Sequence, residues 1–318
     1  MTNTINPANP ALSAVPAEKF RVVGKNTKKM DAISRPSLSY AQDAWRRLKA
    51  NKVAVFSMAL LAAYVLLAIL APLLSRYDMA AQDVNAINLG FSAKHWFGTD
   101  SLGRDMFVRV WQGARVSLSI GFAAAMINAV VGAIVGCISG FYGGKLDMFI
   151  MRLVDVLYGI PSLIVTMLVM MVLGRGVRCL IIAMCIVGWI GACRFARGEM
   201  LRLKNQDFVS AARVLGVHNR TIIFRHILPN MLGLLITNLT MAVPGAIFNE
   251  AFLSFIGLGI APPNSSWGVL AKDGISMLRS QPIQLFVPAF FICTTMLALN
   301  LLGDGLRDAF DPKLRGID

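Results

Sequence analysis

Six long apolar segments constrain this chain more than any other feature. They cover residues 53–74, 116–141, 149–173, 177–193, 231–256 and 285–302. Most of them reach the roughly 20 residues that a helix needs to cross the hydrocarbon core of a bilayer. Charged residues make up only 15 % of the chain, against roughly 25 % in soluble domains. The sequence therefore predicts an all-α integral membrane protein with six transmembrane helices.

The distribution of lysine and arginine predicts the orientation of these helices. Six spans place both termini on one side of the membrane, where 22 of the 31 Lys and Arg residues fall, against nine on the other side. Cytoplasmic segments carry this excess in membrane proteins, so both termini and the polar loop 194–230 are expected in the cytoplasm. The net charge of +14 belongs to these segments. It does not indicate nucleic-acid binding, which would need a basic face on a folded domain.

Composition and hydropathy divide the chain into segments. An amphipathic helix at the membrane interface is expected to turn its apolar side chains toward lipid, namely Tyr40, Ala44, Trp45 and Leu48. The predicted order is a disordered cytoplasmic tail (1–37), this interfacial helix (38–52), the first transmembrane helix (53–74), an external connection (75–115), a five-helix core (116–303) that contains the cytoplasmic loop 194–230, and a cytoplasmic C-terminal tail (304–318).

The cytoplasmic loop has the pattern of two short helices. Asp207 can cap the first helix, and Gly216 supplies a left-handed stop after it. The apolar positions of this helix fall on one face: Phe208, Ala211, Ala212 and Leu215. Asn219 can cap a second helix, which is expected to end at or before Pro229. A small helix–glycine–helix unit facing water predicts a docking surface.

Common catalytic motifs are absent from the sequence. It has no G-x-x-x-x-G-K-[ST] phosphate loop, no H-E-x-x-H and no G-x-S-x-G elbow. Its five cysteines form no C-x-x-C pair, which favours buried apolar roles and predicts no metal site. An integral membrane enzyme stays open as an alternative, with Glu250 and Asp155 as its acids.

A few residues within the spans suggest more specific roles. Gly132, Gly136 and Gly140 form a small-residue stripe that predicts close helix packing. Glu250, beside Asn249, is either a residue of a translocation pathway or a structural hydrogen-bonding group, because a buried carboxylate rarely faces lipid. Asp155 is expected to pair with Arg152.

The external connection contains a charged turn. Its sequence FGTDSLGRDMFVR holds Asp100, Arg104 and Asp105, which can pair with one another. These three residues are also the candidates for docking an external protein.

Several motifs together resemble the permease subunits of bacterial ABC importers for peptides, specifically the second ("C") permease of oligopeptide and dipeptide systems. The loop resembles the EAA motif of that superfamily through Ser210, Ala211, Ala212, Gly216, His226 and Pro229, with Ser210 in place of Glu and His226 in place of Ile. The stretches GTDSLGRD, GARVSL, GFYGGKLD, MRLVD, EAFLSFIGLGIAPPNSSWG and NLLGDGLRDAFDPKLRG occur in the order expected of the family.

The resemblance implies a type I ABC importer permease in a bacterial cell membrane. Such a subunit pairs with a homologous permease, two cytoplasmic ATPases and an external peptide-binding protein. It binds no cofactor itself, since ATP and magnesium are held by the ATPases. The loop 194–230 would then be a coupling loop, with Phe208, Ala211, Ala212 and Leu215 as apolar contacts, Arg213 at the rim and Gly216 as the turn.

Other readings stay open within this resemblance. The same type of subunit serves importers of nickel chelates, glutathione and other solutes. A membrane scaffold without a translocation path is a further alternative.

Overall fold

The computed structural model describes residues 40–310. The predicted tail 1–37 and residues 311–318 of the predicted C-terminal tail lie outside this range. The chain divides into two compact units, Met1–Asp43 and Ala44–Asp318. The helices described below belong to the second unit, except for the first residues of α2 (Tyr40–Ala50).

The regular secondary structure between residues 40 and 310 is entirely helical. The β-type pairing in this range is limited to one isolated bridge, between Thr99 and Asp105. Five helices are long and apolar enough to cross a membrane, and a sixth crossing is present if one bent pair counts as a span. The five are α3 (Lys52–Leu74), α4 (Met106–Tyr142), α7 (Val177–Lys204), the continuous helix Asn219–Phe255, and α12 (Ile283–Phe310). The all-helical membrane class predicted from the apolar segments is confirmed.

The bent pair consists of α5 (Gly144–Tyr158) and α6 (Ser162–Leu173), which meet at 81°. The expectation of one continuous helix over 149–173 is therefore wrong. Gly159 ends α5, and Pro161 precedes α6. Proline lacks an N–H and disfavours helical backbone in the residue before it, so the chain breaks here.

Four helices extend beyond their predicted limits. Helix α7 continues to Lys204 and not to 193, and the helix predicted from 231 begins at Asn219, so much of the predicted loop 194–230 is helical. Helix α4 begins at Met106 and not at 116, because the Asp105 side chain caps it by accepting a hydrogen bond from the Val108 N–H (2.9 Å). The connection predicted over 75–115 therefore ends near residue 105. Helix α12 continues to Phe310, beyond the predicted limit at 303.

Helices α4 and α7 pack closely along the predicted glycine stripe. A Cβ added at Gly132 would lie 2.6 Å from the Ala192 Cβ, and one at Gly136 would lie 2.3 Å from the Cys193 carbonyl oxygen. Gly140 also lies close to α7, with 3.0 Å between its ideal Cβ and the Arg197 carbonyl oxygen. Close packing of this stripe is confirmed.

The short helix α2 contacts protein with part of its apolar face. Ala44 and Leu48 are buried in a cluster with Ala54 and Ala309. Trp45 is 47 % exposed. The expectation that Ala44 and Leu48 face lipid is wrong, since the end of α12 extends far enough to cover them.

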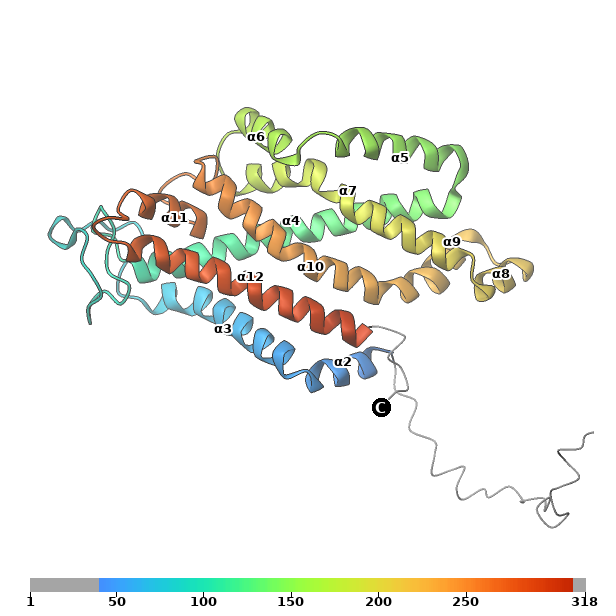
Figure 1. Cartoon of the computed structure of the whole chain (residues 1–318), viewed down its shortest axis with the longest axis horizontal. Helices are drawn as coiled ribbons and strands as arrows, with labels where there is room; N and C mark the ends of the chain where they lie inside the picture. The colour runs from blue at the N-terminus through green and yellow to red at the C-terminus, as the bar shows by residue number, and fades with distance from the viewer. Residues whose placement is uncertain (1–39, 311–318) are drawn as a thin grey trace, which may run out of the picture. The chain divides into compact units, whose positions relative to one another are not determined.

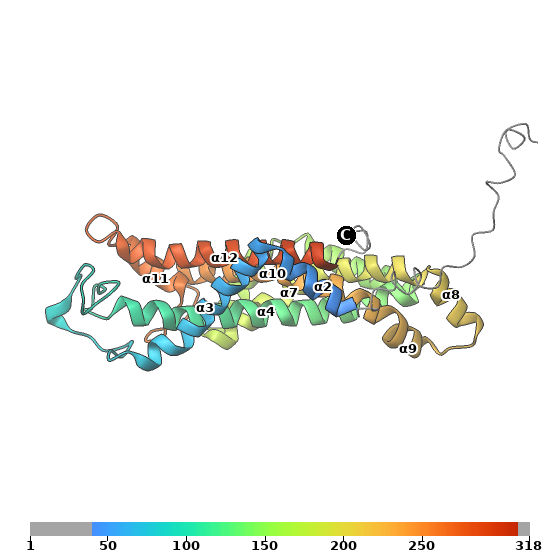
Figure 2. The ribbon, with the colours of Figure 1, turned by 90° about the horizontal axis from the view of Figure 1, so that it is seen from below.

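The two ends of the Ala44–Phe310 bundle differ (Figures 1 and 2). One end carries the small helices α8 (Asp207–Val214) and α9 (Asn219–Thr221). The opposite end carries the connection between α3 and α4 together with α11 (Trp267–Ile275). Functional sites on these two ends therefore face different compartments if the long helices cross a bilayer.

Candidate functional site

Helix α8 follows the end of α7 and lies between two short turns, one at Gln206 and one at Gly216. Gln206, in extended backbone, precedes it, so Asp207 is its first helical residue and not its cap. Gly216 closes the helix with a φ of +74°, and the Val217 N–H donates to the Ala212 carbonyl (3.0 Å). The predicted left-handed stop at Gly216 is confirmed.

The two faces of α8 have different surroundings. Val209 and Ala212 are buried in a cluster with Met200, Ile222 and Met231. The other face is exposed and still apolar at three positions: Phe208 (41 %), Val214 (87 %) and Leu215 (81 %). Ala212 therefore anchors the helix to its own chain, which corrects its assignment to the docking face.

The remaining predicted positions of this segment lie around the same surface. Ser210, Ala211 and Arg213 are exposed. The Arg213 guanidinium lies 5.8 Å from the centre of the Phe141 ring, a cation–π distance that ties the outer face of α8 to the end of α4. This exposed surface, which we call the α8 face, consists of Phe208, Ser210, Ala211, Arg213, Val214 and Leu215.

The second short helix does not end before Pro229. The chain continues from α9 through a π-helical turn (Ile222–Ile227) into α10 (Leu228–Phe255). Pro229 lies directly after the π-helical turn, at the start of α10. His218, and not Asn219, precedes α9. His226 is half-buried and Pro229 exposed at the base of this unit.

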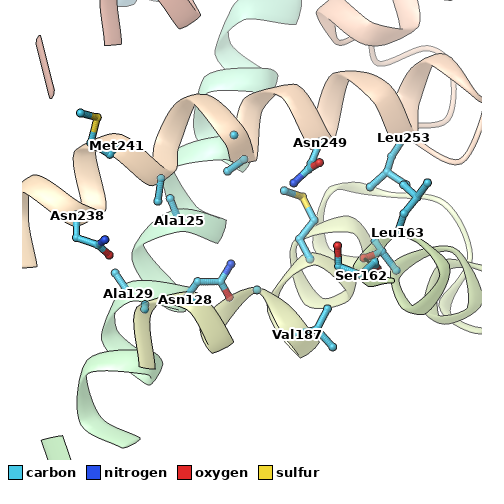
Figure 3. Close-up of a pocket in the computed structure, with 18 residues that line it drawn as sticks. Ala125, Asn128, Ala129, Ser162, Leu163, Val187, Asn238, Met241, Asn249 and Leu253 are labelled. Atoms are coloured by element: carbon cyan, nitrogen blue, oxygen red, sulfur yellow. Dashed lines mark hydrogen bonds between the residues drawn. The ribbon is translucent and has the colours of Figure 1, made fainter. Parts of the chain in front are cut away.

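A cavity of about 410 Å³ lies between α4, α6, α7 and α10. Its polar groups are the carboxamides of Asn128, Asn238 and Asn249, which reach into the space between the helices (Figure 3), and the side chains of Ser162 and Thr166. None of the described residues that line it is ionisable or aromatic. We call it the neutral cavity.

Asn128 packs closely against α7 in the neutral cavity. A Cβ added at Gly188 of α7 would lie 2.3 Å from the Asn128 Nδ2, so the carboxamide lies directly on the glycine. The Asn128 Oδ1 is buried without a hydrogen-bond partner among the described residues. A buried, unpaired acceptor is costly unless a bound molecule or water donates to it.

The structure separates Asn249 from Glu250. Asn249 lines the neutral cavity. Glu250 is fully buried on another face of α10, where its Oε1 accepts a hydrogen bond from the Ser254 hydroxyl (2.8 Å). Of the two pathway candidates, only Asn249 can touch a molecule in the cavity as the helices stand here.

Asp155 does not use its predicted partner. The Arg194 Nη2, on α7, lies 2.6 Å from the Asp155 Oδ1. Both side chains are exposed at this point. The Arg152 pairing inferred from sequence spacing is wrong, because α7 brings a closer cation to the carboxylate.

The charged turn of the connection between α3 and α4 forms an internal network. The Arg104 Nε donates to the Asp100 Oδ2 (2.7 Å), Arg109 donates to the same oxygen, and the His95 Nδ1 lies 2.8 Å from the Asp105 Oδ2. Burial alone would raise the pKa of Asp100, but the Arg109 charge and hydrogen bonds from Arg104 and Leu102 hold that pKa below its usual value. Local pairing of Asp100 with Arg104 is confirmed.

The three charged residues of this turn are too deeply buried to bind another protein directly. Asp100, Arg104 and Asp105 are 3 %, 9 % and 4 % exposed. They hold the connection against the start of α4 and present little surface to an external protein. Any docking surface on this end must therefore use neighbouring residues.

Sequence reasoning missed the residues whose roles depend on neighbouring helices. Asn128 and Asn238 were available as polar residues within apolar segments, but only the fold places them in one cavity with Asn249. Val209 was missed because the predicted apolar face of α8 did not include it, although its side chain is buried. Among residues 40–310 no group of three or more His, Cys, Asp or Glu side chains is placed to hold a metal ion.

A bundle of five or six apolar helices, with a neutral cavity between them and the short helices α8 and α9 at one end, is typical of a multi-pass membrane transport subunit. Comparison with known sequences makes the class specific. Residues 132–316 match the family described as the inner membrane component of binding-protein-dependent transport systems, and residues 39–90 match the N-terminal TM domain of oligopeptide transport permease C. The chain belongs to this permease family and is a multi-pass protein of the bacterial inner membrane.

Curated relatives cover nearly the whole chain. The dipeptide transport permease DppC of Bacillus subtilis is 47 % identical over 302 residues, covering 95 % of this chain and 94 % of the relative. The oligopeptide transport permease OppC of the same species is 46 % identical over 301 residues, covering 95 % and 99 %. OppC of Escherichia coli K12 is 43 % identical over 276 residues, covering 86 % and 91 %. The resemblance drawn from the motifs is confirmed.

A solved structure supports the fold. The inward-facing MetNI methionine ABC transporter matches with a TM-score of 0.54 over 64 % of this chain and 97 % of the other, at 16 % identity. At that identity the match supports the fold alone, a type I importer permease.

Proposed function

We propose that this chain is one of two permease subunits of an ATP-driven importer of oligopeptides or dipeptides. The observation that carries the proposal is the neutral cavity in a chain nearly half identical to peptide permeases. Each carboxamide offers both donors and acceptors, which matches the alternating N–H and C=O groups of a peptide backbone.

The lining of the cavity suits a substrate of variable sequence. Without charged or aromatic side chains, it has no strong preference among the side chains of a peptide. Asn238 and Asn249 lie on one helix, about 16 Å apart by helical rise, which is the length of roughly five extended residues. We expect backbone contacts spaced along α10, and we assign Asn128 a hydrogen bond to a peptide N–H through its unpaired Oδ1.

The α8 face is assigned to one of two cytoplasmic ATPases. Phe208, Ala211 and Leu215 would enter an apolar groove, with Ser210 and Arg213 at its rim. Exposed apolar side chains on a short rigid helix are typical of interface anchors. ATP and magnesium are held by the ATPases, and this chain binds no cofactor in the proposal.

The proposed topology has six crossings, with α5 and α6 together forming the third. Both termini and α8 then lie in the cytoplasm, in agreement with the excess of Lys and Arg on that side. An external binding protein delivers peptide to the opposite end, between this chain and a homologous permease.

In this mechanism ATP binding shifts an existing equilibrium between inward-open and outward-open states. Closure of the ATPases moves α8, and the packed pair α4 and α7 carries the motion to the cavity. The buried contacts of Val209 and Ala212 make α8 a rigid extension of the bundle, which a loose loop would not provide.

The test is uptake by proteoliposomes that hold the complete transporter. Asn249→Leu and Asn238→Leu should each lower peptide uptake about tenfold, the loss expected for one or two hydrogen bonds. Phe248→Leu, an exposed change outside the cavity, is the matched control. Unchanged uptake in both asparagine variants would remove the cavity from the pathway.

A further inference from the structure

A second, smaller cavity lies at the end of the bundle opposite α8. Its volume is about 140 Å³. It is lined by residues of the start of α4, the loop before α7, the loop after α10, and α11. Four of the lining residues are cations: Arg104, Arg109, Arg175 and Lys272. We call it the basic pocket.

Positive charge exceeds negative charge around the basic pocket. Two carboxylates face the four cations: Asp100, which accepts hydrogen bonds from Arg104 and Arg109, and Asp273, whose Oδ2 lies 3.8 Å from the Arg109 Nη2. Arg175 and Lys272 form no ion pair within residues 40–310. Burial raises the pKa of Asp273, although the Arg109 charge opposes this shift.

Arg109 is the clearest sign of a missing partner. Its side chain is 2 % exposed, and its Nε has no hydrogen-bond acceptor among the described residues. A buried cation is stable only when charges and hydrogen bonds compensate it. The residues present supply only part of this compensation, so the pocket is suited to an added anion.

The size and the neighbours of the pocket narrow the choice of anion. A volume of about 140 Å³ admits a carboxylate and a few waters but not a whole peptide. Gly257 also lines it with a φ of +91°, and a Cβ there would lie 2.8 Å from the Lys272 Nζ. A glycine at this position therefore leaves room for the ammonium group beside the pocket.

The basic pocket and the neutral cavity are adjacent along α10. Leu253 lines the neutral cavity, and the next residue, Ser254, lines the basic pocket. The neutral cavity offers no cation to a charged chain end. Every linear peptide with a free C-terminus carries one carboxylate there, whatever its sequence, so a cationic site beside a neutral cavity complements the part of the substrate that does not vary.

We propose that the basic pocket binds the C-terminal carboxylate of an incoming peptide, with Arg175 and Lys272 as its exposed contacts and Arg109 as its buried floor. The inference rests on the proposed function. Asp100 fixes Arg104 and Arg109 in place, while the exposed Arg175 and Lys272 are free to close over the carboxylate.

The experiment compares tri-alanine with tri-alanine amide, using the complete transporter in proteoliposomes and saturating binding protein. Arg175→Gln combined with Lys272→Gln should raise the KM for tri-alanine about tenfold, the loss expected for charge-assisted hydrogen bonds. The KM for the amide should change less than about twofold. Arg279→Gln combined with Lys94→Gln removes two other cations of the same end and should leave both peptides unaffected.

A second measurement does not require uptake of the amide. Sodium acetate, against sodium chloride at equal ionic strength, should compete with tri-alanine in the unsubstituted transporter and lose this effect in the Arg175→Gln, Lys272→Gln transporter. Equal losses for both peptides, or equal acetate inhibition in both transporters, would overturn the proposal. A raised KM for the binding protein itself would assign the carboxylate to that partner and would also overturn it.

Failure of the proposed function can be distinguished from failure of the basic pocket assignment. If the unsubstituted transporter takes up no peptide while its ATPase activity is intact, the chain is not a peptide permease. If it takes up tri-alanine normally and the doubly substituted transporter does the same, only the basic pocket assignment fails.

Discussion

Asp147 on α5 and Arg197 on α7 form a two-contact ion pair. The Arg197 Nε donates to the Asp147 Oδ1 and its Nη2 to Oδ2, each over 2.6 Å. The Ser139 hydroxyl of α4 donates to the same carboxylate, and the Lys204 Nζ donates to the Gly140 carbonyl oxygen (2.7 Å). Three helices are thus tied together at the end that carries α8, which provides a firm base for the coupling proposed above.

Arg197→Lys should weaken this base. A lysine cannot make both parallel contacts with one carboxylate, so a loss of about 1–2 kcal/mol in the free energy of unfolding is expected. The measurement is thermal unfolding of the purified chain in detergent. Arg202→Lys is the control, because its pair with Glu199 is more exposed and should contribute less than about 1 kcal/mol. Equal losses in the two variants would contradict a structural role for Arg197.

Gly216→Val should uncouple transport. The backbone at this position has a φ of +74°, and no atom lies within 4 Å of an added Cβ. The cost is therefore backbone strain, about 1–2 kcal/mol for a non-glycine residue. Peptide uptake and peptide-stimulated ATPase activity should both fall. Gly216→Asn, a residue that tolerates left-handed backbone, should retain most activity; full activity in the valine variant would contradict the strain argument.

Leu215→Asp should weaken binding of the ATPases without unfolding the chain. Leu215 is 81 % exposed, and a charge there would enter the proposed apolar groove. We expect about a tenfold loss of affinity in co-purification, a typical effect for an interface anchor. Val209→Asp, at a fully buried position of the same helix, should instead lower thermal stability. If Leu215→Asp binds the ATPases normally, the α8 face is not their docking surface.

Gly136→Ala should destabilise the packed pair α4 and α7. An ideal Cβ would lie 2.3 Å from the Cys193 carbonyl oxygen, so the helices must separate, at a cost of about 1–3 kcal/mol. Gly198→Ala is the matched control on α7, because nothing lies within 4 Å of its ideal Cβ. Thermal unfolding of the two variants measures the difference. A Gly136→Ala protein as stable as Gly198→Ala would mean that the helices do not approach so closely.

Asp100→Asn should cost stability in a pH-dependent way. The pKa of Asp100 is held below its ordinary value, so the folded state favours the carboxylate. This contribution is present above the ordinary carboxyl pKa and is lost as the pH falls through the lowered one. The stability gap between the unsubstituted protein and the variant should therefore be full at neutral pH and narrow in strong acid. A gap that is constant over this range would contradict the charge-based account.

The parts of the fold that depend on local sequence were predictable. Apolar length alone identifies the membrane helices, and the need for left-handed backbone identifies Gly216. The spacing of Gly132, Gly136 and Gly140 revealed a packing face before its partner helix was known. The peptide-permease resemblance followed from motifs that occur in order along the chain.

Features that depend on contacts between distant segments were not predictable. Asp155 pairs with Arg194 because α7 lies beside α5, which no local spacing indicates. Gly159 and Pro161 mark a disturbance of the third segment, but proline in a membrane helix can cause either a kink or a break. Which face of α8 is buried depends on its contacts with distant residues, because Val209 and Ala212 pack in a cluster with Met231.

The most direct test of the account measures ATP-dependent uptake by proteoliposomes that contain this chain, its partner permease, both ATPases and the binding protein. A series of peptides from two to seven residues is offered beside glutathione and a nickel chelate. We expect saturable uptake of peptides of varied sequence and its loss in Gly216→Val. Uptake of the nickel chelate or glutathione alone, with no peptide accumulation, would contradict it.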